Sequence, residues 1–415
     1  MQHLRAQHSS TLFRLRERQQ RAPKTLKRGT PEAPDKIPCF RPAIGEEEIE
    51  AVTAILRSGW LTTGPKAKEF EEKFAAYMGT GVEAVAVNSA TAGLHLALEA
   101  CGIGPGDEVI VPTLTFTASA SVVRYLGAEV VLVDVEESSR CIDLDNAERR
   151  LTPRCKAIMP VHFAGFPCDM AKILAFARRH GLKVLEDAAH AMPARRDGRL
   201  IGAWESDACV FSFYACKPIT TGEGGMIVTR SPSIAARARV MRTHGLNRDA
   251  FDRFRNVGAS WAYDVVAPGF KYNLTDVAAA IGVVQLSRAE LLQASRQRAA
   301  ERYRRVLAGL PLDCPAAAPV GGVHSWHMFP VRVHQQADAS RDDLIARLAA
   351  MGIGTSVHYR PLHEMTYWKD RYHCEPNEFP VASRYFEGAL TLPLFPGMTD
   401  AEVDRVAGAV RSILV

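Results

Sequence analysis

Residues 181–229 constrain this chain more than any other segment, because two strand patterns there each lead into a reactive side chain. The apolar pair at 184–185 continues into Asp187, and the apolar run at 209–213 is followed by Lys217. In open α/β sheets, ligands bind in the crevice outside the carboxyl ends of the strands. We therefore expect a carboxylate and an amine to face one ligand crevice.

A lysine and an aspartate in this arrangement suit pyridoxal phosphate as the cofactor. This cofactor needs a lysine amine to bond to, and a carboxylate that keeps its pyridine nitrogen protonated. The glycine-rich run at 222–225 lets the backbone turn tightly beside a planar ligand. On these residues alone, a solvated loop lysine at Lys217 and a capping aspartate at Asp187 remain the commoner outcome for such residue types.

Two longer motifs in the same segment favour the cofactor site. The strand end reads EDAAHA at 186–191, and the loop after the next strand reads SFYACKPITTGEGG at 212–225. Both resemble the cofactor site of the DegT/DnrJ/StrS family of nucleotide-sugar aminotransferases, which are fold-type I enzymes. The resemblance covers nearly everything from residue 37 to the C-terminus, and the match of both motifs makes it specific.

The alternation of strand and helix patterns predicts an α/β fold with a doubly wound, mostly parallel sheet. The resemblance implies a large cofactor-binding domain over residues 37–290 and a smaller α+β domain over 291–415. In the smaller domain we expect a strand at 328–333, a helix at 341–351 capped by Ser340, and a strand at 355–359.

Length and composition are ordinary for a soluble globular protein. The chain has 415 residues, of which 47% are hydrophobic and 23% charged. No apolar run approaches the ~18 residues that a membrane span requires. The nine cysteines show no C-x-x-C spacing, which favours free thiols in a reducing compartment, so we expect a cytoplasmic protein.

The net charge of +5 is concentrated at the N-terminus. Residues 1–36 contain nine lysines or arginines and three acids, whereas the remainder holds 42 bases and 43 acids. A nucleic-acid-binding protein carries its basic excess on the folded body, so this class is disfavoured. The basic, proline-containing segment is predicted to be a disordered extension, with a targeting arm as the alternative.

A candidate phosphate site follows the short strand pattern at 84–87. Ala90 and Thr91 lie in a turn between that strand and a helix that we expect to begin at Leu94. Free N–H groups and the helix dipole favour a phosphate at such a turn, although an ordinary N-cap explains the same residues. The resemblance assigns the cofactor phosphate to Ala90 and Thr91, together with Ser212.

The resemblance also implies three further cofactor contacts. Phe116 follows a strand pattern and would stack on the pyridine ring, worth about 1 kcal/mol beyond burial, although a core aromatic is the alternative. His190 would hydrogen-bond near the phenolic oxygen or pack on the ring. Asn273 would reach the cofactor phosphate of a partner subunit. The alternative role for Asn273 is to cap the helix that begins near Asp276.

Histidines in the C-terminal part raise the possibility of a metal site, at positions His324, His327, His358 and His363. No acid or cysteine follows them in register, and aromatic neighbours favour packing, so we expect no metal. By resemblance, the segment that contains His358 frames the substrate end of the cleft, which makes this side chain a candidate sugar contact.

The resemblance implies a homodimeric aminotransferase with shared active sites, in which Lys217, Asp187 and His190 are catalytic. Glutamate would supply the amino group and leave as 2-oxoglutarate, and a nucleotide-linked keto sugar, such as a UDP-4-keto sugar, would become an amino sugar. The block APGFKYNL at 267–274 and HSWHMF at 324–329 most resemble the UDP-4-amino-4-deoxy-L-arabinose aminotransferase branch.

Two other functions remain open on sequence. One is a pyridoxal-phosphate-dependent sugar dehydratase of the same fold. Family members with that activity replace the lysine by histidine, so Lys217 favours transamination. The other is a regulatory or scaffolding protein without catalytic activity, because a fold does not fix a function.

Overall fold

The computed structural model describes residues 36–247 and 263–415. Residues 37–415 form one compact unit. The predicted N-terminal extension, apart from Lys36, lies outside the described residues. The predicted division of the folded unit at residue 290 stays a prediction.

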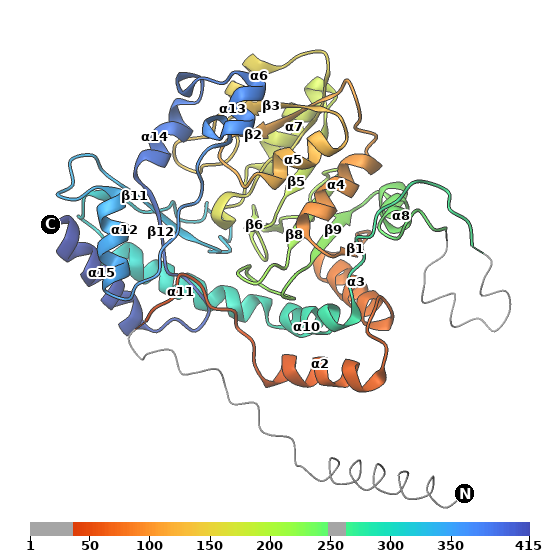
Figure 1. The fold of residues 1–415 in the computed structure, drawn as a ribbon, viewed down its shortest axis with the longest axis horizontal. Helices are drawn as coiled ribbons and strands as arrows, with labels where there is room; N and C mark the ends of the chain where they lie inside the picture. Colours follow the sequence, from red (N-terminus) through yellow and green to blue (C-terminus); the bar gives the residue numbers. More distant parts are fainter. Residues whose placement is uncertain (1–35, 248–262) are drawn as a thin grey trace, which may run out of the picture. The chain divides into compact units, whose positions relative to one another are not determined.

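Within the described residues, seven strands form a central sheet in the order β1-β9-β8-β5-β4-β2-β3 (Figure 1). Six of these strands run parallel and β9 is antiparallel to both of its neighbours. The strands are β1 (Glu83–Val87), β2 (Glu108–Pro112), β3 (Glu129–Val133), β4 (Cys155–Ile158), β5 (Lys183–Asp187), β8 (Ala208–Ser212) and β9 (Gly225–Thr229). The doubly wound, mostly parallel α/β sheet predicted from the sequence is confirmed.

Helices cover both faces of this sheet. The helices that flank the sheet are α3 (Pro65–Met78), α4 (Ala90–Ala100), α5 (Ala118–Tyr125), α6 (Leu144–Arg150), α7 (Met170–His180), α8 (Pro232–Met241) and α10 (Asp276–Ser287), and α2 (Glu46–Ser58) packs on α10. Side chains from α3, α7 and α10 share one hydrophobic core, and those from α4, α5 and α8 share another. Successive residues of a strand point to opposite faces of the sheet, so they pack in different cores, as Ala84 and Val85 of β1 do.

A smaller antiparallel sheet follows in the described C-terminal part, in the order β10-β11-β12. Its strands are β10 (Leu312–Asp313), β11 (Phe329–Val333) and β12 (Ala389–Leu392), and a separate hairpin pairs β6 (Arg195–Arg196) with β7 (Arg199–Leu200). The helices of this part are α11 (Ala289–Val306), α12 (Arg341–Ala350), α13 (Thr366–Tyr372), α14 (Pro380–Gly388) and α15 (Asp400–Leu414). A third core of side chains from α11, α12, α15 and this sheet includes Tyr303, Phe329, Leu344 and Val406.

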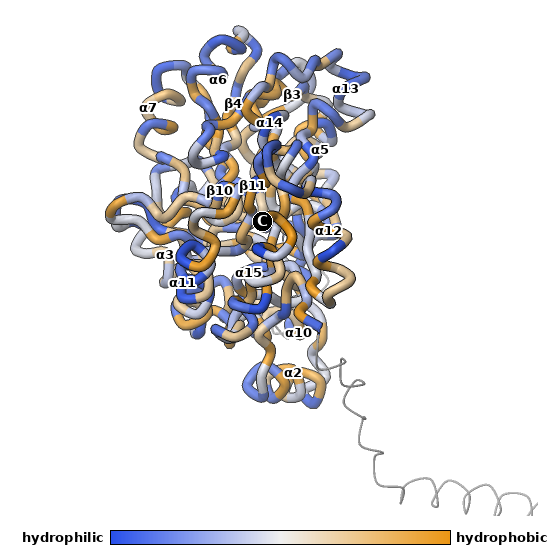
Figure 2. Tube along the Cα trace, turned by 90° about the vertical axis from the view of Figure 1, so that its left-hand side faces the viewer, coloured by the Kyte–Doolittle hydropathy of each residue, from blue (hydrophilic) through white to orange (hydrophobic). Residues whose placement is uncertain are grey.

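Hydropathy along the trace agrees with this arrangement. In Figure 2, α2 shows hydrophobic and hydrophilic colours on successive parts of its turns, as an amphipathic helix does. On α2, Ile55 is buried, whereas Ile49 and Leu56 are 51% and 57% exposed. The apolar surface of α2 around Ile49 and Leu56 is therefore not buried by other described residues.

Two sequence predictions of local structure are wrong. Residues 355–359 do not form a strand, because only Ser356 pairs with Thr391 at the edge of β12. The segment then leaves the sheet edge and brings Tyr359 to a cavity. The helix expected to begin at Leu94 begins at Ala90, because the Ser89 hydroxyl accepts a hydrogen bond from a first-turn N–H and caps the helix there.

The start of α3 is capped by a side chain more than 200 residues away. The carboxylate of Asp276 accepts hydrogen bonds from the backbone N–H groups of Gly64, Lys66 and Ala67, at 2.7, 3.1 and 2.9 Å. Asp276 is the first residue of α10 and is 1% exposed. This carboxylate therefore satisfies donors that helix geometry leaves unpaired and joins α3 to α10.

Replacing this carboxylate should destabilise the fold without touching the cavity. We expect Asp276→Ala to lower the free energy of unfolding by about 2 kcal/mol, because buried N–H groups lose their acceptor. Asp370 is exposed and its side chain makes no hydrogen bond or ion pair with the described residues, so Asp370→Ala should change stability by less than about 0.5 kcal/mol. Urea denaturation followed by circular dichroism measures both, and equal effects would contradict the capping role.

Candidate functional site

A cavity of about 360 Å³ opens at the carboxyl ends of the parallel strands. Its volume lies within the range of about 300–1,000 Å³ that is usual for small-molecule sites. Its lining includes Ser89 after β1, Thr115 after β2, Val161 after β4, Asp187 at the end of β5 and Ser212 at the end of β8. Lys217 also lines it, so the structure brings the predicted carboxylate and amine to one cavity.

The Asp187 carboxylate is held in a fixed orientation. One of its oxygens accepts a hydrogen bond from the Ser119 hydroxyl at 2.7 Å, and the other accepts from the backbone N–H of Ala189 at 3.1 Å. The residue is 6% exposed. Sequence reasoning missed Ser119, whose only signal was its place near the start of a helix that follows a strand.

Lys217 lies in the loop between β8 and β9. Its backbone N–H donates to the carbonyl of Tyr214. Burial lowers the pKa of the Lys217 amine from its ordinary value, while the nearby Cys216 and Asp187 act to raise it. An amine with a lowered pKa is more often neutral near pH 7, which is the state in which it can attack a carbonyl or accept a proton.

Two histidines and a tyrosine form a row of contacts that begins at this amine. The His327 Nε2 atom lies 3.5 Å from Lys217 Nζ, and the rings of His327 and His190 are 4.6 Å apart. The Tyr359 hydroxyl lies 3.3 Å from His190 Nε2. Burial first, and the Lys217 charge second, hold the pKa of both imidazoles well below the usual range. Both histidines are therefore neutral, and each can donate from one ring nitrogen and accept at the other.

Sequence reasoning placed only His190 in this group. His327 belongs to the HSWH motif, whose aromatic neighbours favour packing and give no sign of a contact with Lys217. Tyr359 lies in the segment that was expected to be a strand. Its position next to the cavity depends on that segment leaving the edge of β12, which no local pattern indicates.

The expected phosphate residues lie at the start of α4 and at the end of β8. The backbone N–H groups of Ala90 and Thr91 have no acceptor among the described residues, while the Ser89 hydroxyl accepts from the N–H of Ala92 in the same turn. A β-carbon on Gly225 would come within 2.7 Å of the Ala90 nitrogen, so only glycine lets β9 approach this helix end. With the Ser212 hydroxyl, which also lines the cavity, these groups offer donors to a phosphate.

Phe116 and Asn273 differ in where they lie. Phe116 lines the cavity and is 58% exposed, and its ring is 6.0 Å from that of Tyr359. Asn273 is not among the residues that line the cavity, and its amide nitrogen donates to the Thr63 hydroxyl at 2.6 Å. Thr275, and not Asn273, caps α10.

The other C-terminal histidines make separate contacts. His324 stacks on Trp326 with ring centres 3.9 Å apart, and His363 Nδ1 lies 2.8 Å from the Thr113 hydroxyl. His358 lines the cavity, and its Nδ1 lies 2.8 Å from the Thr391 hydroxyl. Among residues 36–247 and 263–415, no group of three or more histidine, cysteine or acidic side chains could hold a metal ion. Nor is any helix in this described part long and apolar enough to cross a membrane.

The residues around the cavity fit pyridoxal phosphate. The Nδ1 atom of His190, which lines the cavity, is buried without a hydrogen-bond partner among the described residues, and such an atom in a cavity wall favours a polar ligand. The cavity offers an amine, a fixed carboxylate, an exposed aromatic ring and unpaired N–H groups at a helix start. These are the groups that would hold a planar, phosphorylated pyridine.

Comparisons with known proteins agree with this chemistry. Residues 42–411 match the model of the DegT/DnrJ/EryC1/StrS aminotransferase family. The spore coat polysaccharide biosynthesis protein SpsC of Bacillus subtilis (strain 168) is 44% identical over 380 residues, which cover 91% of this chain and 97% of that protein.

Solved structures of similar proteins share the fold. The putative sugar aminotransferase Spr1654 from Streptococcus pneumoniae, in its PMP form, superposes with a TM-score of 0.85 at 35% identity, covering 91% of this chain and 98% of that one. Its PLP form gives a TM-score of 0.84 at 34% identity, covering 92% of this chain and all of that one. DesV of S. venezuelae gives 0.80 at 36% identity, covering 88% of this chain and 94% of that one. With the family model matched over nearly the whole folded unit, the chain belongs to the DegT/DnrJ/EryC1/StrS aminotransferase family.

Proposed function

We propose that this protein transfers an amino group from glutamate to a nucleotide-linked keto sugar, with Lys217, Asp187 and His190 as its catalytic residues. The coarser statement, that it is a sugar aminotransferase that uses pyridoxal phosphate, follows from the family and from neighbours with PLP and PMP forms. The placement of Lys217 and Asp187 on one cavity is the observation that carries the proposal.

Each side chain has a task that its surroundings support. When bound, pyridoxal phosphate supplies an electron sink that stabilises negative charge on the carbon being deprotonated. Lys217 holds the cofactor and moves a proton, because burial favours its neutral amine. Asp187, oriented by Ser119, keeps a negative charge at the end of β5 for the pyridine nitrogen. His190 and His327 stay neutral beside Lys217 and can orient polar groups there.

The proposal that the substrate is a sugar is supported by a second, smaller pocket beside the cavity. Its volume is about 240 Å³, and it shares Cys216 and His358 with the cavity. His327 lies on its wall next to the Lys217 amine. A substrate that extends from the reacting carbon into this pocket would pass His358, which was the sequence candidate for a sugar contact. The uridine carrier and the likeness to the L-arabinose branch remain part of the proposal.

The exposed apolar residues support a homodimer with shared active sites. Phe116 and Tyr214 line the cavity, yet are 58% and 47% exposed in the single chain. Ile49 and Leu56 leave part of α2 uncovered. A second copy could cover these surfaces and present its Asn273 to the cavity, since this side chain lies outside the cavity of its own chain.

The first test measures both half-reactions. With glutamate and a panel of nucleotide-linked keto sugars, we expect equal amounts of 2-oxoglutarate and amino sugar. Lys217→Ala should reduce turnover by on the order of 10³-fold or more and remove the visible absorption of the lysine-bound cofactor, because no other amine replaces it. Lys172→Ala, at a 73% exposed side chain on α7, is the control and should keep full activity. Full activity in Lys217→Ala would exclude the mechanism, and amino sugar formed without 2-oxoglutarate would exclude glutamate as the donor.

The second test measures how the protonation of the Lys217 amine depends on pH. The rate at which apoenzyme takes up pyridoxal phosphate should rise with pH as the Lys217 amine loses its proton. The midpoint should lie below that of an ordinary lysine, because burial lowers this pKa. Asp187→Asn removes a charge that raises the pKa, so the midpoint should move to still lower pH. An unchanged midpoint in Asp187→Asn, in protein that remains folded by circular dichroism, would show that the two groups do not interact.

The third test asks whether the sites are shared. Lys217→Ala and Asn273→Asp should each be nearly inactive, the second because a carboxylate repels the cofactor phosphate. If Asn273 serves the partner's site, each mixed dimer contains one intact site. Randomly mixed subunits should then recover about a quarter of wild-type activity. Recovery should fail if both residues serve the same chain, and the unmixed variants serve as controls.

A further inference from the structure

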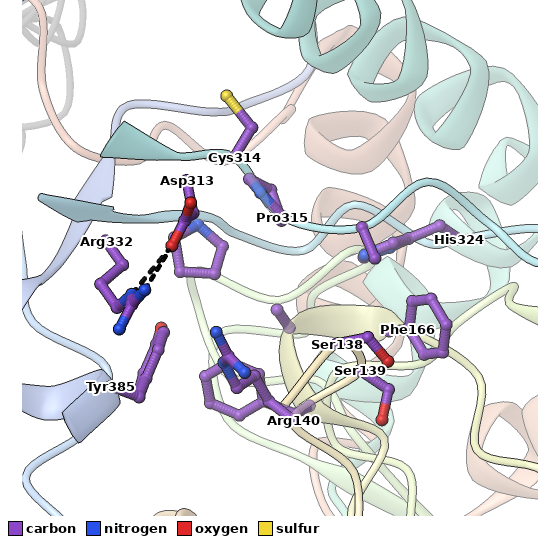
Figure 3. A pocket seen from close by; sticks show the side chains of 14 residues that line it. Ser138, Ser139, Arg140, Phe166, Asp313, Cys314, Pro315, His324, Arg332 and Tyr385 are labelled. Carbon is purple, nitrogen blue, oxygen red and sulfur yellow. Dashed lines mark hydrogen bonds and ion pairs between the residues drawn. The ribbon is translucent and has the colours of Figure 1, made fainter. Parts of the chain in front are cut away.

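A separate small pocket lies between the loop after β3 and the sheet of the C-terminal part (Figure 3). Its volume is about 40 Å³, and it shares no lining residue with the cavity that contains Lys217. The polar side chains in its wall are Ser138, Ser139, Arg140, Asp313, His324, Arg332 and Tyr385. A space of this size has room for a small polar group, since one water needs about 10–15 Å³ by the same measure.

Arg140 makes no hydrogen bond with its guanidinium group to any described residue. The group stacks on the Tyr385 ring, 4.7 Å from its centre. The Glu137 carboxylate lies 3.8 Å from Nη1, which is too far for a hydrogen bond, and Nη1 is buried. An arginine has five N–H donors, and a buried donor without an acceptor is unfavourable.

The backbone of Arg140 is also in an unusual conformation. Its φ angle is 58°, in the left-handed region where residues other than glycine are uncommon. Backbone hydrogen bonds between Glu136 and Cys141 and from Arg140 to Glu136 close the tight loop that holds it there. Such a conformation is unfavourable, and strained residues often lie at functional sites. The loop thus places a charged, unsatisfied group in the pocket wall.

The other charges near the pocket are already paired. Arg332 donates to the Asp313 carboxylate at 2.8 Å, and His334 lies 2.8 Å from the other oxygen of Asp313. The Glu137 carboxylate also forms an ion pair with Arg384. Burial lowers the pKa of Arg140, since no hydrogen-bonded acceptor offsets the loss of water. Among the described residues, Arg140 therefore pairs with Glu137 only at 3.8 Å, and its buried Nη1 has no acceptor within hydrogen-bond distance.

We propose that this pocket binds a small oxyanion, through the Arg140 guanidinium and the Ser138 hydroxyl. The Ser139 hydroxyl also lies at the pocket, but it already donates to the Glu136 carboxylate at 2.6 Å. A phosphate or carboxylate group offers planar pairs of acceptor oxygens that match the arginine fork. The pocket is too small for a nucleotide or a sugar, which separates it from the substrate site. Bound there, the anion would also join the loop after β3 to β10 and β11, because residues from all three line the pocket.

Binding of inorganic phosphate to the enzyme loaded with pyridoxal phosphate tests this site. The loaded enzyme is needed because free phosphate would otherwise bind where the cofactor phosphate does. We expect millimolar phosphate to raise the midpoint of thermal unfolding of the wild type, with chloride at equal ionic strength having no such effect. Acetate distinguishes a carboxylate-accepting site from one that takes only phosphate. No phosphate-dependent rise in the wild type would overturn the proposal.

Two pairs of variants locate the effect. Arg140→Gln should weaken phosphate binding by about tenfold or more, whereas Arg384→Gln removes an equal charge nearby and should change it by less than about twofold. Ser138 is exposed on the loop, so Ser138→Asp should fold and place a competing carboxylate at the pocket. It should abolish binding, and the uncharged Ser138→Asn should retain it. Equal binding in Ser138→Asp and Ser138→Asn, or an effect of Arg384→Gln as large as that of Arg140→Gln, would overturn the assignment.

Discussion

The alternation of side chains along β5 places two adjacent carboxylates on opposite faces of the sheet. Glu186 points into one core, where the His162 Nε2 atom lies 3.0 Å from one oxygen and the Ser206 hydroxyl donates to the other at 2.5 Å. The Cys168 backbone N–H donates to His162 Nδ1, so the hydrogen of this ring is on Nε2 and is donated to Glu186. The next residue, Asp187, faces the cavity. A shift of β5 by one residue would exchange these two carboxylates, so the buried network fixes which one reaches the site.

The same network supports the end of the strand. The backbone N–H of His162 donates to the carbonyl of Asp187, and the N–H of Asp187 donates to the carbonyl of Pro160. Asp187 is thus held through its backbone by the segment after β4 and through its carboxylate by Ser119 at the start of α5. Residues from three neighbouring strand ends must fold together before this carboxylate has its orientation, which explains why its chemistry depends on the whole parallel sheet.

The sequence predicted well those features that a local pattern determines. The strand that leads to Asp187 follows from its hydrophobic pattern, and the cap of α12 at Ser340 follows from capping chemistry. The structure has both. It failed where distant segments meet. His327 reaches Lys217 from a loop before β11, and Tyr359 reaches His190 from an irregular segment beside β12. Neither contact has a signature in the nearby sequence, because each depends on how the smaller sheet packs against the larger one.

The segment from Asn273 to Asp276 shows how one short stretch can serve several elements. Thr275 caps α10, and Asp276 caps α3 across more than 200 residues. Asn273 donates one amide hydrogen to Thr63, whose hydroxyl in turn donates to the carbonyl of Leu274. An asparagine amide has two hydrogens and a carbonyl oxygen, so one donor of Asn273 remains available after this contact. The two caps fix the backbone that directly follows Asn273, and Thr63 binds its side chain, so this donor is held in place before any partner arrives. Presenting it to a second subunit would need little loss of side-chain freedom, which is the condition under which one hydrogen bond across an interface contributes most.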